Sequence, residues 1–281
     1  MPELPEVETV RRGLEQRTSG FAIDRVAVHR ARAIAAPKGD QEAFCKALAG
    51  RTLQGWQRRG KYLIGQLDQG HLGVHLRMTG QFLWLEASRS QAHPPCSHTR
   101  VQLWNTAGQE LRFIDTRSFA ELWWVPPGQP VEAVITGLQR LGPEPFDPAF
   151  DASYLKSKLK SSRRPIKNAL LDQALVAGVG NIYADEALFA AGIRPQTPSR
   201  RLSSPRLKQL HQSLVDVLQQ SIGAGGTTFS DFRDLTGTNG NYGGMAWVYR
   251  RTGQPCRRCG QPITRSTLGG RSSHWCPSCQ H

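Results

Sequence analysis

The sequence predicts an α+β protein, in which an amino-terminal antiparallel β-sandwich with flanking helices precedes a helical domain and a carboxyl-terminal zinc finger. Three observations carry this prediction. Short apolar runs separated by turn residues occupy positions 51–125, apolar residues at helical spacing dominate positions 151–222, and two Cys-x-x-Cys pairs lie near the end of the chain. The 281 residues are enough for two domains that each bury a core.

The charge of the chain indicates a polyanionic partner. The formal net charge is +14. Residues 1–149 carry 18 Lys and Arg against 15 Asp and Glu, a net +3, whereas residues 150–281 carry 18 against 7, a net +11. Clustered cations favour binding to phosphates because they displace counterions, so nucleic acid is the expected partner. A basic surface that only aids solubility is the alternative.

The chain is expected to be a cytoplasmic protein that makes no membrane contact. Its mean hydropathy is −0.45, and no apolar run approaches the roughly 20 residues that a membrane span needs. The acidic residues at positions 3 and 6 do not resemble the start of a secretory signal.

The first expected element is a helix close to the amino terminus. Leu4, Val7, Val10 and Leu14 follow helical spacing, and Gly20 marks the end of the segment. Further along, pairs of apolar runs flank turn-like residues, which predicts antiparallel hairpins rather than a doubly wound parallel sheet. The predicted strands are 63–67, 71–76, 101–104 and 111–114.

The pattern becomes helical after a Pro-rich stretch at 142–148. Pro165 suits the first turn of one helix, and a longer helix after Pro205 carries leucines on one face. A segment rich in Gly, Thr and Asn at 227–244 is expected to be a loop. The predicted helices are 151–161, 165–176, 182–191 and 203–222.

Gly178-Val179-Gly180-Asn181 is predicted to form a tight turn between two helices. Glycines let the backbone approach a ligand closely, and the second helix would direct free N–H groups and its positive dipole at an anion. A group of cations lies just upstream, at Lys156, Lys158, Lys160, Arg163, Arg164 and Lys167. A phosphate site is one interpretation, and a helix hairpin that merely uses Gly as a stop is the other.

The motif Cys256-x2-Cys259-x16-Cys276-x2-Cys279 predicts one structural Zn²⁺. Four thiolates fill a tetrahedral coordination shell, so no position is left for catalysis. Gly269-Gly270 is expected to turn the intervening hairpin and to place Arg271 at or near its tip. Cys45 and Cys96 stand alone and are expected to be packed thiols.

Pro2 offers an unusual nucleophile, because it follows the initiator Met1. Removal of Met1 would leave a secondary α-amine, whose reference pKa of about 8 makes it far less protonated than lysine. Such an amine can attack a carbon of aldehyde character and form an iminium. Glu3 and Glu6 lie close enough in the sequence to transfer protons. From these residues alone, an ordinary helix start with acids favoured by the helix dipole is the preferred interpretation, since Pro and Glu are common at helix starts.

The segment Pro2-Glu3-Leu4-Pro5-Glu6-Val7-Glu8-Thr9 resembles the start of the formamidopyrimidine-DNA glycosylase family. Four further motifs of that family follow in order along the whole chain. They are Arg59-Gly60-Lys61-Tyr62-Leu63, His75-Leu76-Arg77-Met78-Thr79-Gly80, Asp115-Thr116-Arg117-Ser118-Phe119 and Gly178-Val179-Gly180-Asn181-Ile182-Tyr183-Ala184. The zinc finger matches last. The family fold is a β-sandwich with flanking helices, a helix–two-turn–helix module and a zinc finger, in agreement with the elements predicted above.

The resemblance implies a base excision repair enzyme that removes oxidised purines, 8-oxoguanine and formamidopyrimidines, and then cuts the backbone by β,δ-elimination. Pro2 is implied as the nucleophile, with Glu3, Glu6 and Lys61 as the other catalytic residues. DNA contacts are implied for His98, Arg117, Asn181, Arg271 and Lys167. Met78, Arg117 and Phe119 would fill the gap left by the flipped nucleotide, and Thr227 and Thr228 would belong to the loop over the lesion.

The same resemblance implies four segments: a catalytic β-sandwich at 1–134, a linker at 135–148, a helix–two-turn–helix domain at 149–235 and the zinc finger at 245–281. The expected partner is damaged double-stranded DNA, and the expected state is a monomer without a nucleotide cofactor.

Two other functions stay open at this point. An endonuclease VIII-like enzyme would use the same proline chemistry on oxidised pyrimidines. A non-catalytic zinc-ribbon protein would bind nucleic acid without cutting it, and its binding would be salt-sensitive.

Overall fold

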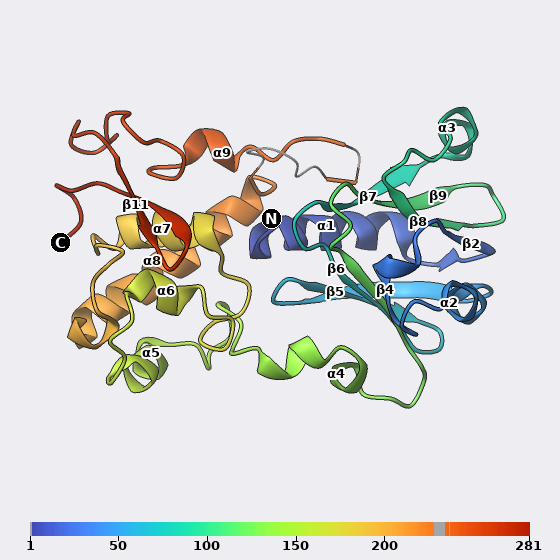
Figure 1. The fold of residues 1–281 in the computed structure, drawn as a ribbon, viewed down its shortest axis with the longest axis horizontal. Coiled ribbons are helices and arrows are strands. Elements are labelled where there is room, and N and C mark those ends of the chain that lie inside the picture. The colour runs from blue at the N-terminus through green and yellow to red at the C-terminus, as the bar shows by residue number, and fades with distance from the viewer. Residues whose placement is uncertain (1, 228–233, 236) are drawn as a thin grey trace. The chain divides into compact units, whose positions relative to one another are not determined.

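The computed structural model describes residues 2–227, 234–235 and 237–281 (Figure 1). The chain forms two compact units. The first unit comprises Met1–Gln139 and Gly225–Asn241, and the second comprises Arg140–Ala224 and Tyr242–His281. These units divide the chain differently from the four predicted segments, because residues 225–241 return to the first unit. Among the described residues, no helix is long and apolar enough to cross a membrane.

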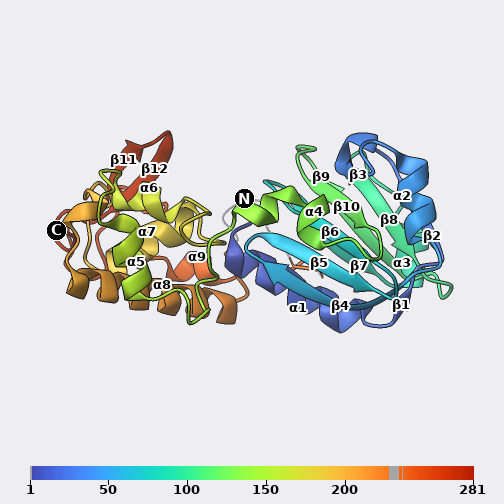
Figure 2. The same ribbon diagram turned by 90° about the horizontal axis from the view of Figure 1, so that it is seen from below.

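The first unit is a β-sandwich of two sheets (Figure 2). A six-stranded sheet has the order β1-β4-β5-β6-β10-β3, and a four-stranded sheet has the order β2-β8-β9-β7. All neighbouring strands are antiparallel except β10 and β3. The strands are β1 Phe21–Ala22, β2 Arg25–Val28, β3 Ile34–Ala36, β4 Thr52–Arg59, β5 Tyr62–Leu67, β6 His71–His75, β7 Gly80–Leu85, β8 Thr99–Trp104, β9 Glu110–Asp115 and β10 Glu121–Val125.

Helix α1 is built into this sandwich and packs on β4 and β5. Its predicted apolar face is buried: Val7, Val10 and Leu14 join one core with residues of both sheets. Burying each such side chain stabilises the fold by roughly 1.5–3 kcal/mol, so the start of α1 is held firmly against the sheet. The helices of this unit are α1 Leu4–Thr18, η1 Ala31–Ala33, α2 Gln41–Leu48, α3 Ala87–Ala92, α4 Val131–Val134 and η2 Thr136–Arg140.

The second unit is helical and ends in a β-hairpin. Its helices pack around a core of their own, to which α7 and α8 contribute half of the leucine side chains. A separate small apolar cluster joins Phe189 and Val248 to Cys256 and Cys276. The elements are α5 Ala152–Leu159, α6 Ile166–Leu170, α7 Asn181–Ala190, η3 Ser199–Arg201, α8 Ser204–Gly223, α9 Tyr242–Met245, β11 Thr264–Leu268 and β12 Arg271–Trp275.

Three sequence-based expectations need correction, and several short elements were not predicted. Cys96 was expected to be a packed thiol, but it is exposed. The helix predicted over 165–176 ends as α6 at Leu170, since turns occupy the residues that follow. The loop predicted over 227–244 contains the start of α9. The short strands β1–β3 and helices α2 and α3 were not predicted, because segments of two to eight residues carry too few apolar repeats to show a period.

Candidate active site

The amino terminus of the first unit is a buried polar cluster. Pro2 is buried, and Glu3 and Glu6 are only 3% and 1% exposed. Glu3 caps α1 in a reciprocal arrangement: its side chain accepts from the N–H of Glu6, and its own N–H donates to Glu6 Oε2 at 2.8 Å. This capping box satisfies two N–H groups of the helix start. Pro2 directly precedes this capping box, so its nitrogen, a secondary amine once Met1 is removed, belongs to the positive end of α1.

Glu6 also holds the segment that returns from the second half of the chain. Its Oε1 accepts from the N–H of Thr227 at 2.8 Å, so the two oxygens of one carboxylate bind two different backbone segments. A Cβ on Gly226 would lie 3.1–3.3 Å from Glu6 atoms, and φ there is +78°, which favours glycine. Thr227 is buried at 3% exposure. Thr228, the other residue expected over the lesion, lies outside the described residues.

Lys61 is buried at 7% exposure and forms the β4–β5 turn together with Gly60. Its charge acts on His75, which ends β6. Burial, followed by the charges of Arg77 and Lys61, lowers the pKa of His75 from 6.5 to about 3. His75 Nδ1 accepts from the N–H of Arg77 at 3.0 Å. His75 is therefore neutral at physiological pH, and the buried Lys61 lies close enough for its charge to act on the His75 ring.

Two neighbouring loops carry the side chains expected to fill the gap of a flipped nucleotide. Met78 and Phe119 are large apolar residues that are 37% and 46% exposed. The Arg117 guanidinium carbon lies 5.1 Å from the centre of the Phe119 ring. The N–H of Arg117 donates to Thr79 Oγ1 at 3.1 Å, which joins the loop of Met78 to the loop of Arg117 and Phe119.

His98 is exposed and lies beside this pair of loops. Its carbonyl oxygen accepts from the N–H of Asp115 at 2.9 Å. Asp115 belongs to one of the family motifs, and its carboxylate accepts from Thr79 and from two N–H groups of the following loop. Sequence reasoning missed it because nothing in the residue type separates a buried acceptor from a surface acid. The only available signal was an acid that ends an apolar run.

In the second unit, the turn before α7 meets the carboxyl-terminal hairpin. Asn181 begins α7, and its Nδ2 donates to Ser272 Oγ at 3.4 Å, next to exposed Arg271. The buried Oδ1 of Asn181 has no hydrogen-bond partner among the described residues. Gly269 and Gly270 turn the hairpin with φ of +55° and +75°, so the predicted turn and the position of Arg271 beside it are confirmed. The structure thus brings Asn181 and Arg271 together.

Lys167 differs from its predicted role as a DNA contact. It is fully buried, and its Nζ lies 2.7 Å from Asp185 Oδ1 and 2.6 Å from the carbonyl oxygen of Ser272. A buried ammonium needs such partners, because an unpaired charge in an apolar interior is very costly. The N–H of His274 donates to the other Asp185 oxygen at 2.9 Å. The prediction for Lys167 is therefore wrong: it ties α6 and α7 to the hairpin.

Glu186, the next residue of α7, anchors the chain just before the zinc motif. It is fully buried and accepts from the N–H groups of Trp247, Val248 and Tyr249 at 2.8–2.9 Å. Burial raises the pKa of Glu186 above its ordinary value. Asp185 and Glu186 were missed by the sequence reasoning, although two adjacent acids within an apolar helix are a usable sign of buried anchors.

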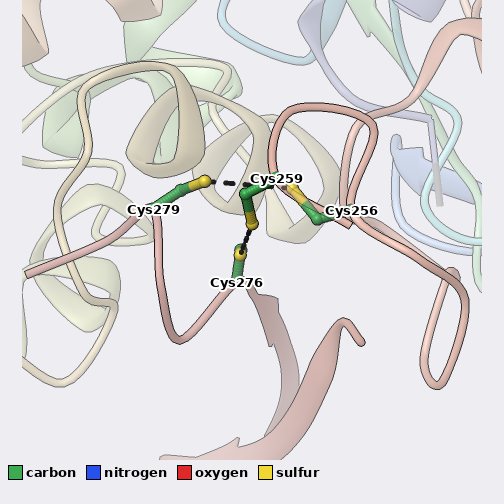
Figure 3. A group of neighbouring side chains, drawn as sticks. All are labelled: Cys256, Cys259, Cys276 and Cys279. Atoms are coloured by element: carbon green, nitrogen blue, oxygen red, sulfur yellow. Dashed lines mark hydrogen bonds between the residues drawn. The ribbon is translucent and has the colours of Figure 1, made fainter. Parts of the chain in front are cut away.

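The four motif cysteines converge in the second unit (Figure 3). Their sulfur atoms all lie within 4.8 Å of one another. The pairs Cys256–Cys279 and Cys259–Cys276 are 3.9 and 3.5 Å apart. Zinc–sulfur bonds of about 2.3 Å in a tetrahedron place sulfurs roughly 3.8 Å apart. These residues fit one structural zinc ion, which would join the two knuckles on either side of the β11–β12 hairpin.

Family models match the chain in three consecutive parts. The formamidopyrimidine-DNA glycosylase N-terminal domain matches residues 1–122, the H2TH domain of the same glycosylase matches 141–233, and a zinc finger found in FPG and IleRS matches 253–281. The chain belongs to the formamidopyrimidine-DNA glycosylase family. The H2TH domain is the helix–two-turn–helix module expected from the resemblance, and the α+β fold class is confirmed.

Members of the formamidopyrimidine-DNA glycosylase family are similar to this chain over its whole length. The formamidopyrimidine-DNA glycosylase of Parasynechococcus marenigrum strain WH8102 is 64% identical over 282 residues, and that of Prochlorococcus marinus strain MIT 9313 is 60% identical over 295 residues. Both alignments cover 100% of each chain.

Solved structures of the family agree with the fold. The Lactococcus lactis Fpg in complex with DNA that contains an abasic site is 35% identical, with a TM-score of 0.89 and coverage of 99% of both chains. A mutant of that protein with DNA containing Fapy-dG has a TM-score of 0.90. The wild-type protein has also been solved with DNA containing an oxidised pyrimidine, at a TM-score of 0.89.

Proposed function

We propose that this chain is a DNA glycosylase and AP lyase of base excision repair that removes oxidised purines from double-stranded DNA, with Pro2 as its nucleophile. The observation that carries the proposal is the buried cluster at the amino terminus. A prospective secondary amine, two carboxyl groups and a helix start occupy one site in a member of the formamidopyrimidine-DNA glycosylase family. Abasic and Fapy-dG DNA in the complexes of the Lactococcus relative support the substrate class.

The proposed reaction starts once Met1 has been removed and the Pro2 amine is free. The amine lone pair attacks C1′ of the damaged nucleotide, and the base departs with the electrons of the glycosidic bond. Opening of the sugar ring then yields an iminium between Pro2 and C1′. The iminium acidifies the C2′ proton, and its loss expels the 3′ phosphate. A second elimination expels the 5′ phosphate, and water releases Pro2.

Glu3 is proposed to protonate the ring oxygen as the sugar opens and then to shuttle protons. Proton transfer by a well-placed side chain contributes about 10²–10⁴-fold to a rate. Glu6 assists by fixing the Glu3 backbone through the 2.8 Å bond to its N–H. Lys61, buried and cationic, is proposed to bind the phosphate or the lesion. The positive end of α1 disfavours the protonated amine of Pro2 and so keeps it nucleophilic.

The damaged nucleotide has to leave the base stack before Pro2 can reach C1′. Met78, Arg117 and Phe119 are proposed to occupy the gap that remains. Their exposure in the unbound protein and the proximity of Arg117 to the Phe119 ring support this role. Such a wedge would offset an unstacking cost of a few kcal/mol. Thr227, held by Glu6, is proposed to belong with Thr228 to the loop over the extruded base.

His98, Asn181 and Arg271 are proposed to contact phosphates beside the lesion. The Asn181 Nδ2 donor beside Ser272 and the exposed Arg271 side chain support this proposal, because phosphate oxygens accept hydrogen bonds and attract cations. The zinc ion supplies no chemistry in this scheme: four thiolates fill its coordination shell and stabilise the hairpin. The bacterial cytoplasm, where the chromosome lies, is the proposed location.

The lesion class can be tested by a direct comparison of substrates. The zinc-containing protein is incubated with duplexes that carry 8-oxoguanine opposite cytosine or thymine glycol opposite adenine, and the released ends are resolved by electrophoresis. Faster cleavage of the 8-oxoguanine duplex, with phosphate on both ends of the gap, is expected. Faster cleavage at thymine glycol would favour the endonuclease VIII-like alternative, and binding without cleavage would favour the zinc-ribbon alternative.

A further inference from the structure

We infer that Asp115 is a positioning residue that holds Met78, Arg117 and Phe119 in one arrangement for the extrusion of the damaged nucleotide. This inference rests on the proposed function. Asp115 ends β9 and is 1% exposed, so it does not contact solvent or a substrate directly. It would act through the two loops that carry the three exposed side chains.

The Asp115 carboxylate binds both loops. Thr79 Oγ1 donates to Oδ1 at 2.5 Å, which attaches the residue next to Met78. The N–H of Arg117 donates to the same oxygen at 3.2 Å, and the N–H of Ala120 donates to Oδ2 at 2.8 Å. One buried side chain therefore fixes the start and the end of the turn that presents Arg117 and Phe119. Hydrogen bonds to a carboxylate are stronger than those between neutral groups.

Each of the two loops contains a non-glycine residue in a backbone conformation that such residues rarely adopt. Ser118 has φ of +56° and Arg77 has φ of +52°, the left-handed region in which non-glycine residues are uncommon. A residue held there costs on the order of 1 kcal/mol or more, so the turn persists only if its surroundings hold it. The two N–H groups bound by Asp115 lie on either side of Ser118.

The main chain of Asp115 binds a third segment. Its N–H donates to the carbonyl oxygen of His98 at 2.9 Å, and its own carbonyl oxygen accepts from Arg100 Nη2 at 2.5 Å. The side chain and the backbone of one buried residue thus connect the segments of Met78, of Arg117 and Phe119, and of His98. Removing the carboxylate would loosen the wedge loops while leaving these backbone bonds to the third segment.

The loss of Asp115 is expected to slow the reaction on one kind of substrate more than on another. A wedge matters when a nucleotide has to be extruded from a duplex, whereas an abasic site in a single strand already exposes its aldehyde to Pro2. The test compares excision of 8-oxoguanine from a duplex with strand cleavage at an abasic site in a single-stranded oligonucleotide. For Asp115→Asn, the ratio of the two rates is expected to fall by about tenfold, the effect of one lost charged hydrogen bond.

Companion variants separate positioning from general damage. Thr79→Val removes a hydroxyl that contacts both Asp115 and Arg117 and should lower the same ratio, whereas Thr79→Ser should restore it. Glu110→Gln changes the buried carboxylate at the other end of β9, which binds Arg112, Ser90 and Gln102. It neutralises an equally buried carboxylate of the same strand and should leave the ratio unchanged.

The outcomes are distinct. A wild-type ratio in both Asp115→Asn and Thr79→Val overturns the inference, and so does an equal loss on both substrates. If Asp115→Asn does not fold, the Thr79 pair alone decides between these results. If the wild-type protein cleaves neither substrate, the proposed function fails instead.

Discussion

Single buried side chains determine much of the chemistry of this molecule. Glu6 and Asp115 each use both carboxylate oxygens to hold separate backbone segments. Lys167 shows the opposite case, since a lysine in a basic run is buried in an ion pair with Asp185. Spacing alone indicated the four cysteines, and the family resemblance indicated Pro2 and Glu3. Burial depends on distant contacts and could not be derived from local sequence.

His75 predicts a pH-dependent stability. Its folded pKa of about 3 lies below its ordinary value of 6.5, so the folded protein binds fewer protons than the unfolded chain between these values. The contribution of neutral His75 to the free energy of unfolding is fully present above pH 6.5. It is lost as the pH falls from 6.5 towards 3, at up to about 1.4 kcal/mol per pH unit.

Urea unfolding at pH 7 and pH 5.5 checks this expectation. The wild-type protein should lose about 1 kcal/mol more than His75→Asn between these two values. Asn retains an acceptor for the N–H of Arg77 but does not titrate. An equal loss in both proteins would contradict a neutral, buried His75.

At the scale of elements, helix α1 positions the buried amino-terminal cluster of the first unit, and helix α7 positions the turn and the hairpin contacts of the second. The helices with long apolar periods, α1, α7 and α8, were predicted close to their observed bounds. Helix α6 was predicted too long because Pro165 and the apolar residues after it suggested a helix up to 176, whereas turns follow Leu170. The parallel pairing of β10 with β3 joins strands far apart in sequence, so no local pattern could reveal it.

The hydrogen bond from the N–H of Thr227 to Glu6 joins α1 to the segment that returns to the first unit. We therefore expect Glu6→Gln to have a local effect there. A glutamine has one acceptor oxygen, so it cannot accept from both Glu3 and Thr227. We expect a loss of about 1–3 kcal/mol in the free energy of unfolding and faster hydrogen exchange at the Thr227 amide. Glu42→Gln on the exposed face of α2 is the matched control and should change neither. Unchanged exchange at Thr227 would show that the bond is not maintained.

We expect the substitution of one motif cysteine to remove the zinc ion that stabilises the β11–β12 hairpin. Cys259→Ser should lower bound zinc from about one ion per chain to none and weaken DNA binding, because four thiolates are needed to close the site. Cys45→Ser, outside the cluster, should retain the metal. Metal analysis after gel filtration measures both variants. Full zinc content in Cys259→Ser would contradict the four-cysteine site.

At the scale of the whole molecule, charge is unevenly distributed along the chain. The net +11 of residues 150–281 lies mainly in the sequence of the second unit, whereas the proposed chemistry lies in the first. Composition was enough to predict a nucleic-acid partner and two domains. It could not show that residues 225–241 return to the first unit, because that return depends on Glu6 and on the packing of Leu235 in the sandwich core.

This charge predicts strongly salt-dependent binding to DNA. The affinity for a duplex should fall by about a thousandfold or more between roughly 50 and 200 mM salt if six or more phosphates are neutralised. Arg271→Ala should reduce the slope of log affinity against log salt by about one. Fluorescence anisotropy over a salt series measures both. A slope that Arg271→Ala leaves unchanged would remove Arg271 from the phosphate contacts.

The central claim is that the Pro2 amine forms the covalent intermediate, and borohydride trapping tests it most directly. The processed protein, Glu3→Gln and a form that retains Met1 are mixed with a duplex containing 8-oxoguanine opposite cytosine, reduced, and digested for peptide mass mapping. The account predicts an adduct on the peptide that begins at Pro2, a much smaller yield with Glu3→Gln, and none when Met1 blocks the amine. An adduct on a lysine such as Lys61, or an adduct that persists with Met1 in place, would contradict it.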